Sequence, residues 1–226
     1  MPNVSGKSKY NNWSSTRSAN LAGIIAPVVF VAFFTIEGWL RPGYNPMSMF
    51  VSELSLGVWG WMQIANFLIT GTLIFLFGRG VTRQFTAGKA AKIGSICLQI
   101  IGLSLIASGP FITDPSVMFN QSSIHGIIHG IFGAIAFSLM PVTCFVFFLR
   151  SRRDASRRAF AWWTLAIGVF LVIGIGFLKV SQFPQSNLFI WKGLIQRIIL
   201  ISYMAWLFVF ATQLFRSVRS NLQTNN

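Results

Sequence analysis

The side chains with the clearest capacity for chemistry are Asp114, His125 and His129. The two histidines are four residues apart, so on a helix they share one face, with Cβ atoms roughly 5–6 Å apart. That spacing suits two ligands of one metal ion, and Asp114 or Glu53 would supply a carboxylate as the third ligand. Such a site would hold zinc with an open position for water, and the activated water would hydrolyse an ester or an amide.

Other interpretations of the same residues stay open. The stretch 125–129 lacks the glutamate of a metalloprotease HExxH helix. The histidines would instead bond to Asp114, Glu53 or backbone carbonyls and hold helices together, or titrate near neutral pH in a proton-transfer or pH-sensing site. Ser52 beside Glu53 would form a Ser/His/acid arrangement with His125 if the fold joined them, but the chain has no GxSxG elbow.

Long apolar segments must position these residues. Of the 226 residues, 54% are hydrophobic and 10% are charged, whereas a soluble domain carries roughly 25% charged residues. A transmembrane helix needs about 20 mostly apolar residues. The sequence predicts six such helices, at about 20–40, 59–79, 91–113, 124–149, 159–180 and 191–215.

The apolar runs are continuous and show no strand-like alternation, which favours helices over a membrane barrel. We therefore predict an all-α polytopic membrane protein, with a single six-helix bundle over residues 20–215. Residues 1–19 and 216–226 are predicted to be tails, the first of them flexible.

The basic residues fall on alternate connections between the predicted helices. Fourteen of the 18 Lys and Arg residues lie on one side, at Lys7, Lys9, Arg17, Arg79, Arg83, Lys89, Lys92, Arg150, Arg152, Arg153, Arg157, Arg158, Arg216 and Arg219. The positive-inside rule assigns that side, and with it both termini, to the cytoplasm, with the protein in the plasma membrane. The net charge of +14 thus indicates topology and contact with anionic headgroups, and it does not indicate nucleic-acid binding.

A second set of polar residues is predicted at the opposite, extracytoplasmic side. The candidate ligand-binding side chains are Glu37, Arg41, Tyr44, Ser52, Glu53, Lys192 and Arg197. Glu37 and Arg41 are four residues apart on a helix, a spacing that predicts an ion pair. Arg41, Lys192 and Arg197 would be available to an anion.

The connection at about 41–58 is predicted to contain a short amphipathic helix. Asn45 can cap a helix, Pro46 suits its first turn and Gly57 can end it. One face of this helix would be apolar, with Met47, Phe50, Val51 and Leu54. The opposite face would carry Ser48, Ser52 and Ser55. We expect this helix to lie on the outer membrane surface or to fold over the bundle, as a structural plug or as a lid.

Small residues within the helices predict close packing. Gly126 and Gly130 form a GxxxG pair, followed by Gly133. Cys97 and Cys144 are expected at similar depth as packing residues, and no disulfide is predicted.

The chain resembles a family of bacterial and archaeal six-span proteins, catalogued as domain of unknown function number 998. The resemblance covers about 20–215 and is carried by Gly23, Pro27, Arg41-Pro42-Gly43-Tyr44, Ser52-Glu53-Leu54, Gly71, Phe111 to Pro115, His125-Gly126 and His129-Gly130. It implies the six-span topology and suggests that the outward polar positions belong together, but it implies no activity.

Ser52, Asp114, His125 and His129 also show a weaker likeness to the zinc-site residues of a membrane hydrolase group. That group includes alkaline ceramidases and progestin/adiponectin-type receptors. Its members use three histidines and seven spans, whereas this chain has two histidines and six predicted spans.

Three functions stay open. In the first, an outward-facing polar pocket binds a lipid headgroup, a small ligand or a partner protein. In the second, Asp114, His125 and His129 form a metal-dependent intramembrane hydrolase for a lipid-linked substrate, with zinc as the cofactor. The third, a small transporter, is disfavoured because the helix centres carry Ser, Thr, Asn66 and Gln99 and no acid. The sequence defines neither the substrate nor the oligomeric state.

Overall fold

Six long helices dominate the structure, a computed structural model that describes residues 4–85, 88–115 and 122–223. Within these ranges every regular element is helical, and six helices are long and apolar enough to cross a membrane. The elements are α1 (Val4–Leu40), η1 (Val51–Ser55), α2 (Gly60–Gln84), α3 (Lys89–Ser108), α4 (Ile124–Ser151), η2 (Ala155–Arg157), α5 (Arg158–Val180), η3 (Phe189–Trp191) and α6 (Lys192–Gln223), where η marks a short 3₁₀ helix. The predicted all-α, six-span class is confirmed.

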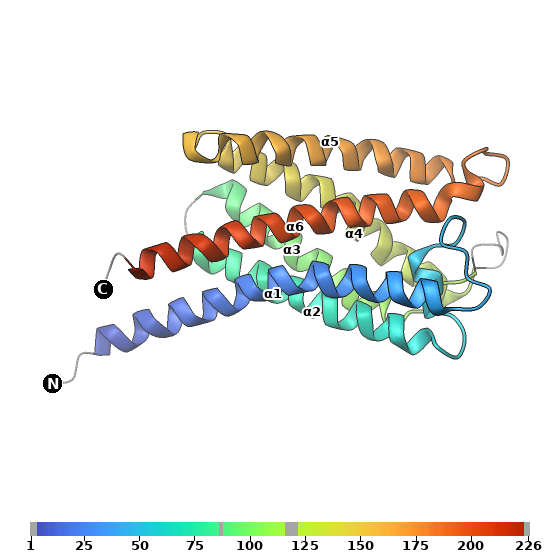
Figure 1. Cartoon of the computed structure of the whole chain (residues 1–226), viewed down its shortest axis with the longest axis horizontal. Coiled ribbons are helices and arrows are strands. Elements are labelled where there is room, and N and C mark those ends of the chain that lie inside the picture. The colour runs from blue at the N-terminus through green and yellow to red at the C-terminus, as the bar shows by residue number, and fades with distance from the viewer. Residues whose placement is uncertain (1–3, 86–87, 116–121, 224–226) are drawn as a thin grey trace.

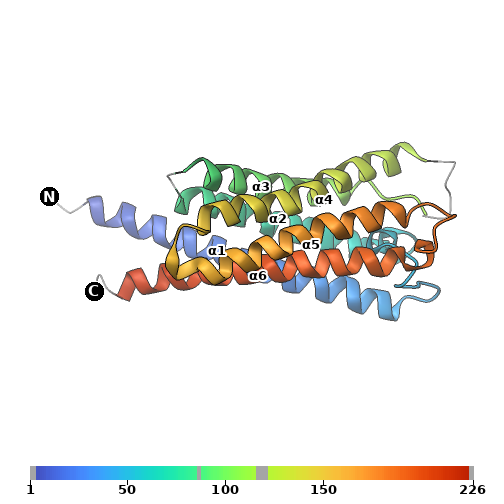
Figure 2. The ribbon, with the colours of Figure 1, turned by 90° about the horizontal axis from the view of Figure 1, so that it is seen from above.

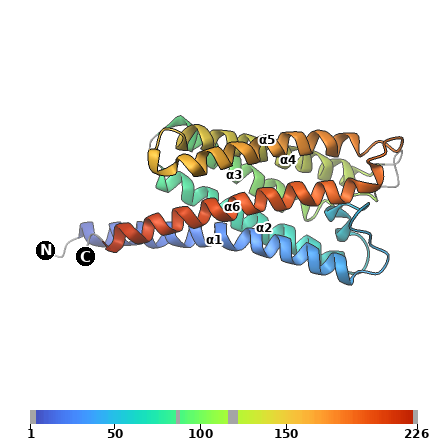
Figure 3. The ribbon, with the colours of Figure 1, turned by 45° about the horizontal axis from the view of Figure 1, so that its top comes forward.

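The helices form a closed ring. Each long helix packs against its neighbour in the chain, and α6 returns to pack against α1 (Figures 1 and 2). Because the chain reverses at every connection, both termini lie at one end of the ring (Figure 3). This end also carries the α2–α3 and α4–α5 connections. We call it the basic end, because basic residues such as Arg83 and Arg150 lie at these connections. The other end, with the α1–α2, α3–α4 and α5–α6 connections, is called the loop end.

Aromatic side chains fill the half of the ring next to the basic end. The rings of Phe147 and Phe210 are 4.4 Å apart between centroids, and Trp206 stacks on Phe210 at 5.4 Å. All three side chains are at most 3% exposed. Trp206 donates its indole N–H to Thr164 Oγ1 at 3.1 Å, which satisfies a polar group that would otherwise be buried without a partner.

Glycine allows two of the helices to approach closely. A Cβ at Gly71 of α2 would lie 2.6 Å from the carbonyl oxygen of Gly102 in α3, and one at Gly102 would lie 2.7 Å from that of Gly71. The prediction of close packing is wrong for Gly130 and Gly133, where an added Cβ would meet open space. They face a cavity instead of a neighbouring helix.

Several helix boundaries differ from the predicted ones. The third helix ends at Ser108 and does not reach 113, because Pro110 has no N–H with which to continue the hydrogen-bond ladder. In contrast, α1 begins at Val4 and α6 ends at Gln223, so both run beyond their apolar segments. Neither extension contains proline, and helical hydrogen bonding continues into the polar sequence.

The segment 41–58 does not form the predicted amphipathic helix. Turns precede the five-residue 3₁₀ helix η1. Ser55 of the expected polar face is 2% exposed, whereas Met47 of the expected apolar face is 44% exposed. Arg197 provides the physical reason, because it binds the carbonyls of Pro46 and Met49 and so holds the backbone in turns. The segment folds over the bundle, where η1 packs against α1, α2 and α6.

The ring and the positive-inside rule predict which loops face outward. A membrane-impermeant maleimide should label Asn187→Cys in intact cells but label Ala155→Cys only after permeabilisation, because α5 separates these exposed positions. The native Cys97 and Cys144 are 6% and 0% exposed, so the wild type should stay unlabelled. Equal labelling of both variants in intact cells would contradict the proposed orientation.

Candidate functional site

Arg197 of α6 holds the connection 41–58 against the loop end of the ring. Its guanidinium donates to the carbonyls of Pro46 at 2.6 Å and Met49 at 3.0 Å, and to the hydroxyl of Tyr44. The side chain is 9% exposed. A guanidinium carries five N–H donors, so one buried residue satisfies several loop acceptors that would otherwise be poorly solvated at this depth.

The residues beside Arg197 bind the same segment. Gln196 accepts a hydrogen bond from the backbone N–H of Val51 at 2.7 Å. The N–H of Leu194 donates to the carbonyl of Met47 at 3.0 Å. At Gly193 an added Cβ would lie 2.7 Å from the carbonyl oxygen of Pro46. The first turns of α6 therefore bind the segment through hydrogen bonds and close backbone packing.

Tyr44 links the arginine to the next turn of the segment. Its hydroxyl donates to the carbonyl of Phe50 at 3.0 Å while it accepts from Arg197. Burial raises the pKa of Tyr44 to about 12, although the positive charge of Arg197 acts in the opposite direction. The hydroxyl therefore keeps its proton at physiological pH and serves as a donor, not as an anion.

Glu37 and Arg41 form the predicted ion pair, with 3.7 Å between Glu37 Oε1 and Arg41 Nη1. Arg41 also donates to the carbonyl of Leu54. Among the described residues, neither carboxylate oxygen of Glu37 has a hydrogen-bond partner. Because Arg41 contacts both Glu37 and the carbonyl of Leu54, it connects the end of α1 to the later part of the same segment.

Glu53 and Lys192 lie at the same end of the bundle. With Glu37, Arg41, Tyr44 and Arg197 they form what we call the polar group. Glu53 accepts a hydrogen bond from the N–H of Phe50 at 2.8 Å, which caps η1. The ammonium of Lys192 lies 3.8 Å from the ring centroid of Phe189 and 5.5 Å from that of Phe50, a cation–π geometry. Glu53 and Lys192 are 3% and 2% exposed.

The structure thus brings most of the predicted ligand-binding residues together at the loop end. Glu37, Arg41, Tyr44, Glu53 and Arg197 bind one another or the backbone of the segment 41–58. Ser52 differs, because it lines a cavity. The polar group is therefore an anchor for the segment, and the cavity lies beside it.

Asp114 closes the corner between α3 and α4. Its Oδ2 accepts a hydrogen bond from the backbone N–H of Ser123 at 2.8 Å, and Ser123 caps α4 by accepting from the N–H of Gly126 at 3.0 Å. The carboxylate lies so close to Gly126 that any Cβ there would collide with it. A carboxylate at this position also suits the positive end of the helix dipole.

The two histidines have different surroundings. His129 is 8% exposed, and its Nδ1 lies 2.8 Å from the carbonyl oxygen of Phe111. A carbonyl can only accept, so Nδ1 carries the proton and Nε2 of the neutral ring does not. His125 is exposed and lies against the ring of Phe111, with 5.7 Å between centroids.

The described residues contain no group of three or more His, Cys, Asp or Glu side chains that could hold a metal ion. Asp114, His125 and His129 occupy one corner of the bundle, but Asp114 binds the start of α4 and His129 binds Phe111. These contacts agree better with a structural role, in which the residues hold helices together, than with a metal site. The assignment of catalytic or metal-binding roles to them stays a prediction.

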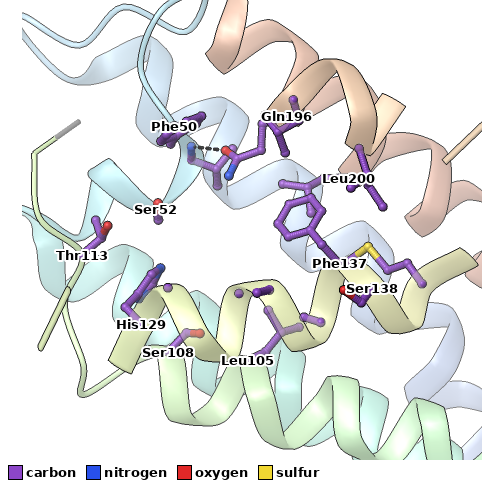
Figure 4. Close-up of a pocket in the computed structure, with 18 of the residues that line it drawn as sticks. Phe50, Ser52, Leu105, Ser108, Thr113, His129, Phe137, Ser138, Gln196 and Leu200 are labelled. Carbon is purple, nitrogen blue, oxygen red and sulfur yellow. Dashed lines mark hydrogen bonds between the residues drawn. The ribbon is translucent and has the colours of Figure 1, made fainter. Parts of the chain in front are cut away.

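A cavity of about 460 Å³ occupies the half of the ring next to the loop end. It reaches from the segment 41–58 to the middle of the bundle, and Figure 4 shows Ser52, Thr113 and His129 toward one end with Phe137 and Leu200 toward the other. Its volume lies within the range of about 300–1,000 Å³ typical of small-molecule sites. The aromatic cluster described above separates it from the basic end.

The wall of the cavity is apolar in the interior and polar toward the loop end. Buried Phe30, Met140 and Leu200 line its inner part. Toward the loop end the lining includes Ser52, Thr113, His129, Lys179, Gln182 and Gln196. The cavity therefore offers an apolar chamber with a polar rim and a cation at Lys179.

The cavity opens between α4 and α5. Its lining residues Gly130, Ala134 and Ser138 on α4 are exposed, as are Lys179 and Gln182 on α5. The two helices touch nearer the basic end, where a Cβ at Gly168 would lie 3.1 Å from that of Cys144, and they diverge toward the loop end (Figure 1). The opening faces sideways, between two of the helices that are long and apolar enough to cross a membrane.

Sequence reasoning missed Gln196 and the aromatic lining. Gln196 precedes Arg197 within an apolar helix, and this placement of a polar amide is the signal that would have identified it. Phe67 and Phe137 carry no comparable signal, because they are two of the 23 phenylalanines of this chain.

The ring of apolar helices, its internal cavity and the segregation of basic residues define an all-helical polytopic membrane protein. The chain belongs to DUF998, a family described as proteins of unknown function, which matches over residues 24–213. The predicted family of unknown function is therefore confirmed, whereas its description as bacterial and archaeal six-span proteins stays a prediction. Searches of curated proteins and of solved structures find no match. The weaker likeness to alkaline ceramidases and adiponectin-type receptors stays a prediction.

Arg197→Met should detach the segment 41–58, because methionine fills part of the space but donates no hydrogen bond. The free energy of unfolding in detergent should fall by about 3 kcal/mol, since carbonyls of Pro46 and Met49 lose their donor. Limited proteolysis should then cut within 41–58. Arg216→Met, at an exposed position, is the control and should change the free energy of unfolding by less than about 0.5 kcal/mol. Equal stability of the two variants would refute the anchoring role.

Proposed function

We propose that this protein binds one amphiphilic molecule, with a single apolar chain and an anionic head, in the cavity near the loop end. The observation that carries the proposal is the cavity itself, with an apolar interior and a polar rim. An apolar chain among Phe30, Met140 and Leu200 would leave little empty space between them. A head at the rim would meet Lys179 and the side chains beside it.

The position of the opening supports a ligand that comes from the membrane. The gap between α4 and α5 faces the lipid, and its edge consists of small residues such as Gly130 and Gly133. A chain could pass from the bilayer into the cavity without crossing water. The segment 41–58 covers the loop end of the cavity with Phe50, Val51 and Ser52, so a sideways route is the shorter one.

The charge distribution supports an origin in the outer leaflet. By the positive-inside rule, the basic residues at the other end of the ring favour a cytoplasmic position for that end. The cavity would then open at the depth of the outer half of a plasma membrane. Binding, presentation or extraction of an outer-leaflet lipid follows as the class of function.

A hydrolase needs an activated nucleophile, and among the described residues the hydrogen bonds of Asp114 and His129 do not form one. Asp114 binds the N–H of Ser123 and His129 binds the carbonyl of Phe111. We therefore propose binding and no catalytic step.

Gly133→Phe should fill the opening and block the ligand. The probe is lysophosphatidylglycerol, added to the purified protein and counted as adducts by native mass spectrometry. We expect one adduct on the wild type and about a ten-fold weaker affinity in the variant. The helix itself should tolerate the change, because glycine is the poorer helix former.

The matched control is Gly176→Phe, which also replaces a helical glycine that faces open space but does not line the cavity. It should bind as the wild type does. Lys179→Gln should reduce the preference for lysophosphatidylglycerol over lysophosphatidylcholine while leaving total binding of the latter unchanged. Equal adducts on the wild type, Gly133→Phe and Gly176→Phe would overturn the proposal.

A further inference from the structure

A second, smaller hollow of about 100 Å³ lies at the basic end, on the far side of the aromatic cluster. Its floor consists of Phe85, Phe147 and Phe210, and its rim carries Arg150, Asp154 and Arg157. Phe147 and Phe210 are 1% and 3% exposed. The floor is therefore a fixed part of the bundle, while the rim is polar and charged.

Within the described part of the chain, the two arginines are held at the rim by contacts that leave most of their donors unused. The guanidinium of Arg150 lies 5.2 Å from the ring centroid of Phe85. The contact of Arg157 with Asp154 uses Nε, at 3.4 Å from Asp154 Oδ2. A guanidinium carries five N–H groups, so the Nη atoms of Arg157 keep a planar fork that suits a phosphate oxygen pair.

Asp154 does not cancel the positive charge of the rim. Its Oδ1 accepts hydrogen bonds from the N–H of Ser156 at 3.0 Å and from the hydroxyl at 2.6 Å, so the carboxylate is directed to the start of η2. The Ser156 hydroxyl, with Arg157 nearby, holds the pKa of Asp154 below its ordinary value, and the group stays ionised. Two arginines against one aspartate still leave an excess positive charge at the hollow.

We propose that this hollow binds one phosphate group, supplied by the head of an anionic phospholipid or by free phosphate. The volume of about 100 Å³ suits a small group, and the arginines provide charge and planar pairs of N–H donors at the rim. The hollow also lies where α4 leaves the apolar span, which is the depth of the headgroups of the adjoining leaflet. This site is separate from the cavity near the loop end and does not depend on the function proposed for it.

The sharpest test compares Arg150→Gln with Arg152→Gln. Both remove one positive charge and one arginine that lies over a phenylalanine ring, Arg152 being 5.9 Å from the centroid of Phe148. Arg150 lines the hollow and Arg152 does not. Diffuse attraction to an anionic surface would be reduced equally in both variants, whereas a built site would be reduced in one.

The measurement is retention of phosphatidylglycerol by the full chain in native mass spectrometry, after transfer from mixed phosphatidylglycerol and phosphatidylcholine nanodiscs. We expect Arg150→Gln to weaken phosphatidylglycerol binding about ten-fold and Arg152→Gln to change it less than about two-fold. The pair Arg150→Gln/Arg157→Gln should weaken it further than Arg152→Gln/Arg153→Gln. The single Arg150→Gln variant keeps the contact of Asp154 with Arg157, so the connection retains its anchor.

Inorganic phosphate at millimolar concentration distinguishes the two sources. If it displaces phosphatidylglycerol from the wild type and stabilises the wild type but not Arg150→Gln against heat, free phosphate is the ligand. If it does neither, the lipid head is the ligand. Equal weakening of phosphatidylglycerol binding in Arg150→Gln and Arg152→Gln, or no selective retention by the wild type, would overturn the proposal.

Discussion

The hydrogen bonds between Arg197 and the segment 41–58 are the constraint on which the loop end of the molecule depends. At membrane depth a backbone carbonyl has few water molecules to bind, so a connection can fold inward only where the protein supplies donors. Arg197 supplies them to Pro46 and Met49. The segment then covers the ring, and Phe50, Val51 and Ser52 become part of the cavity wall. Without this anchor the cavity would lose its cover.

One half of the interior of the ring is closely packed, and the other half contains the cavity. The half next to the basic end is closed by aromatic rings that contact one another at 4.4 to 6.1 Å between centroids. In the other half the divergence of α4 and α5 leaves about 460 Å³. Glycines serve both halves, because Gly71 and Gly102 bring two helices together, while Gly130 and Gly133 keep an opening free. The same residue type thus has opposite effects, decided by its neighbours.

The sequence was sufficient to predict the six helices, because apolar segments of about 20 residues are typical of membrane-spanning helices. It also predicted that the polar residues of the loop end lie opposite the basic connections, but it left open whether they converge. It did not predict their arrangement, since the turns at Pro46 to Met49 depend on Arg197, about 150 residues away along the chain. The expected amphipathic helix failed for this reason, as a distant donor outweighed local periodicity.

The histidines illustrate a second limit. Their spacing on one face of α4 was predicted correctly, but a metal site also needs a third ligand at the right distance. That distance depends on where α3 ends, and Pro110 ends it early, so that Phe111 and Asp114 meet the start of α4 as hydrogen-bond partners. The sequence predicted an outward-facing polar pocket, but it gave no sign of an apolar cavity, which depends on how α4 and α5 diverge.

Photocrosslinking with a single-chain anionic lipid that carries a diazirine at the end of its chain tests the central claim most directly. After irradiation in membranes and digestion, the account predicts that the crosslinks lie on Phe137, Met140 and Leu200, which line the inner cavity. An excess of unlabelled lysophosphatidylglycerol should remove them. Crosslinks confined to lipid-facing residues such as Val172 and Ile173, exposed on α5, would contradict a ligand inside the ring.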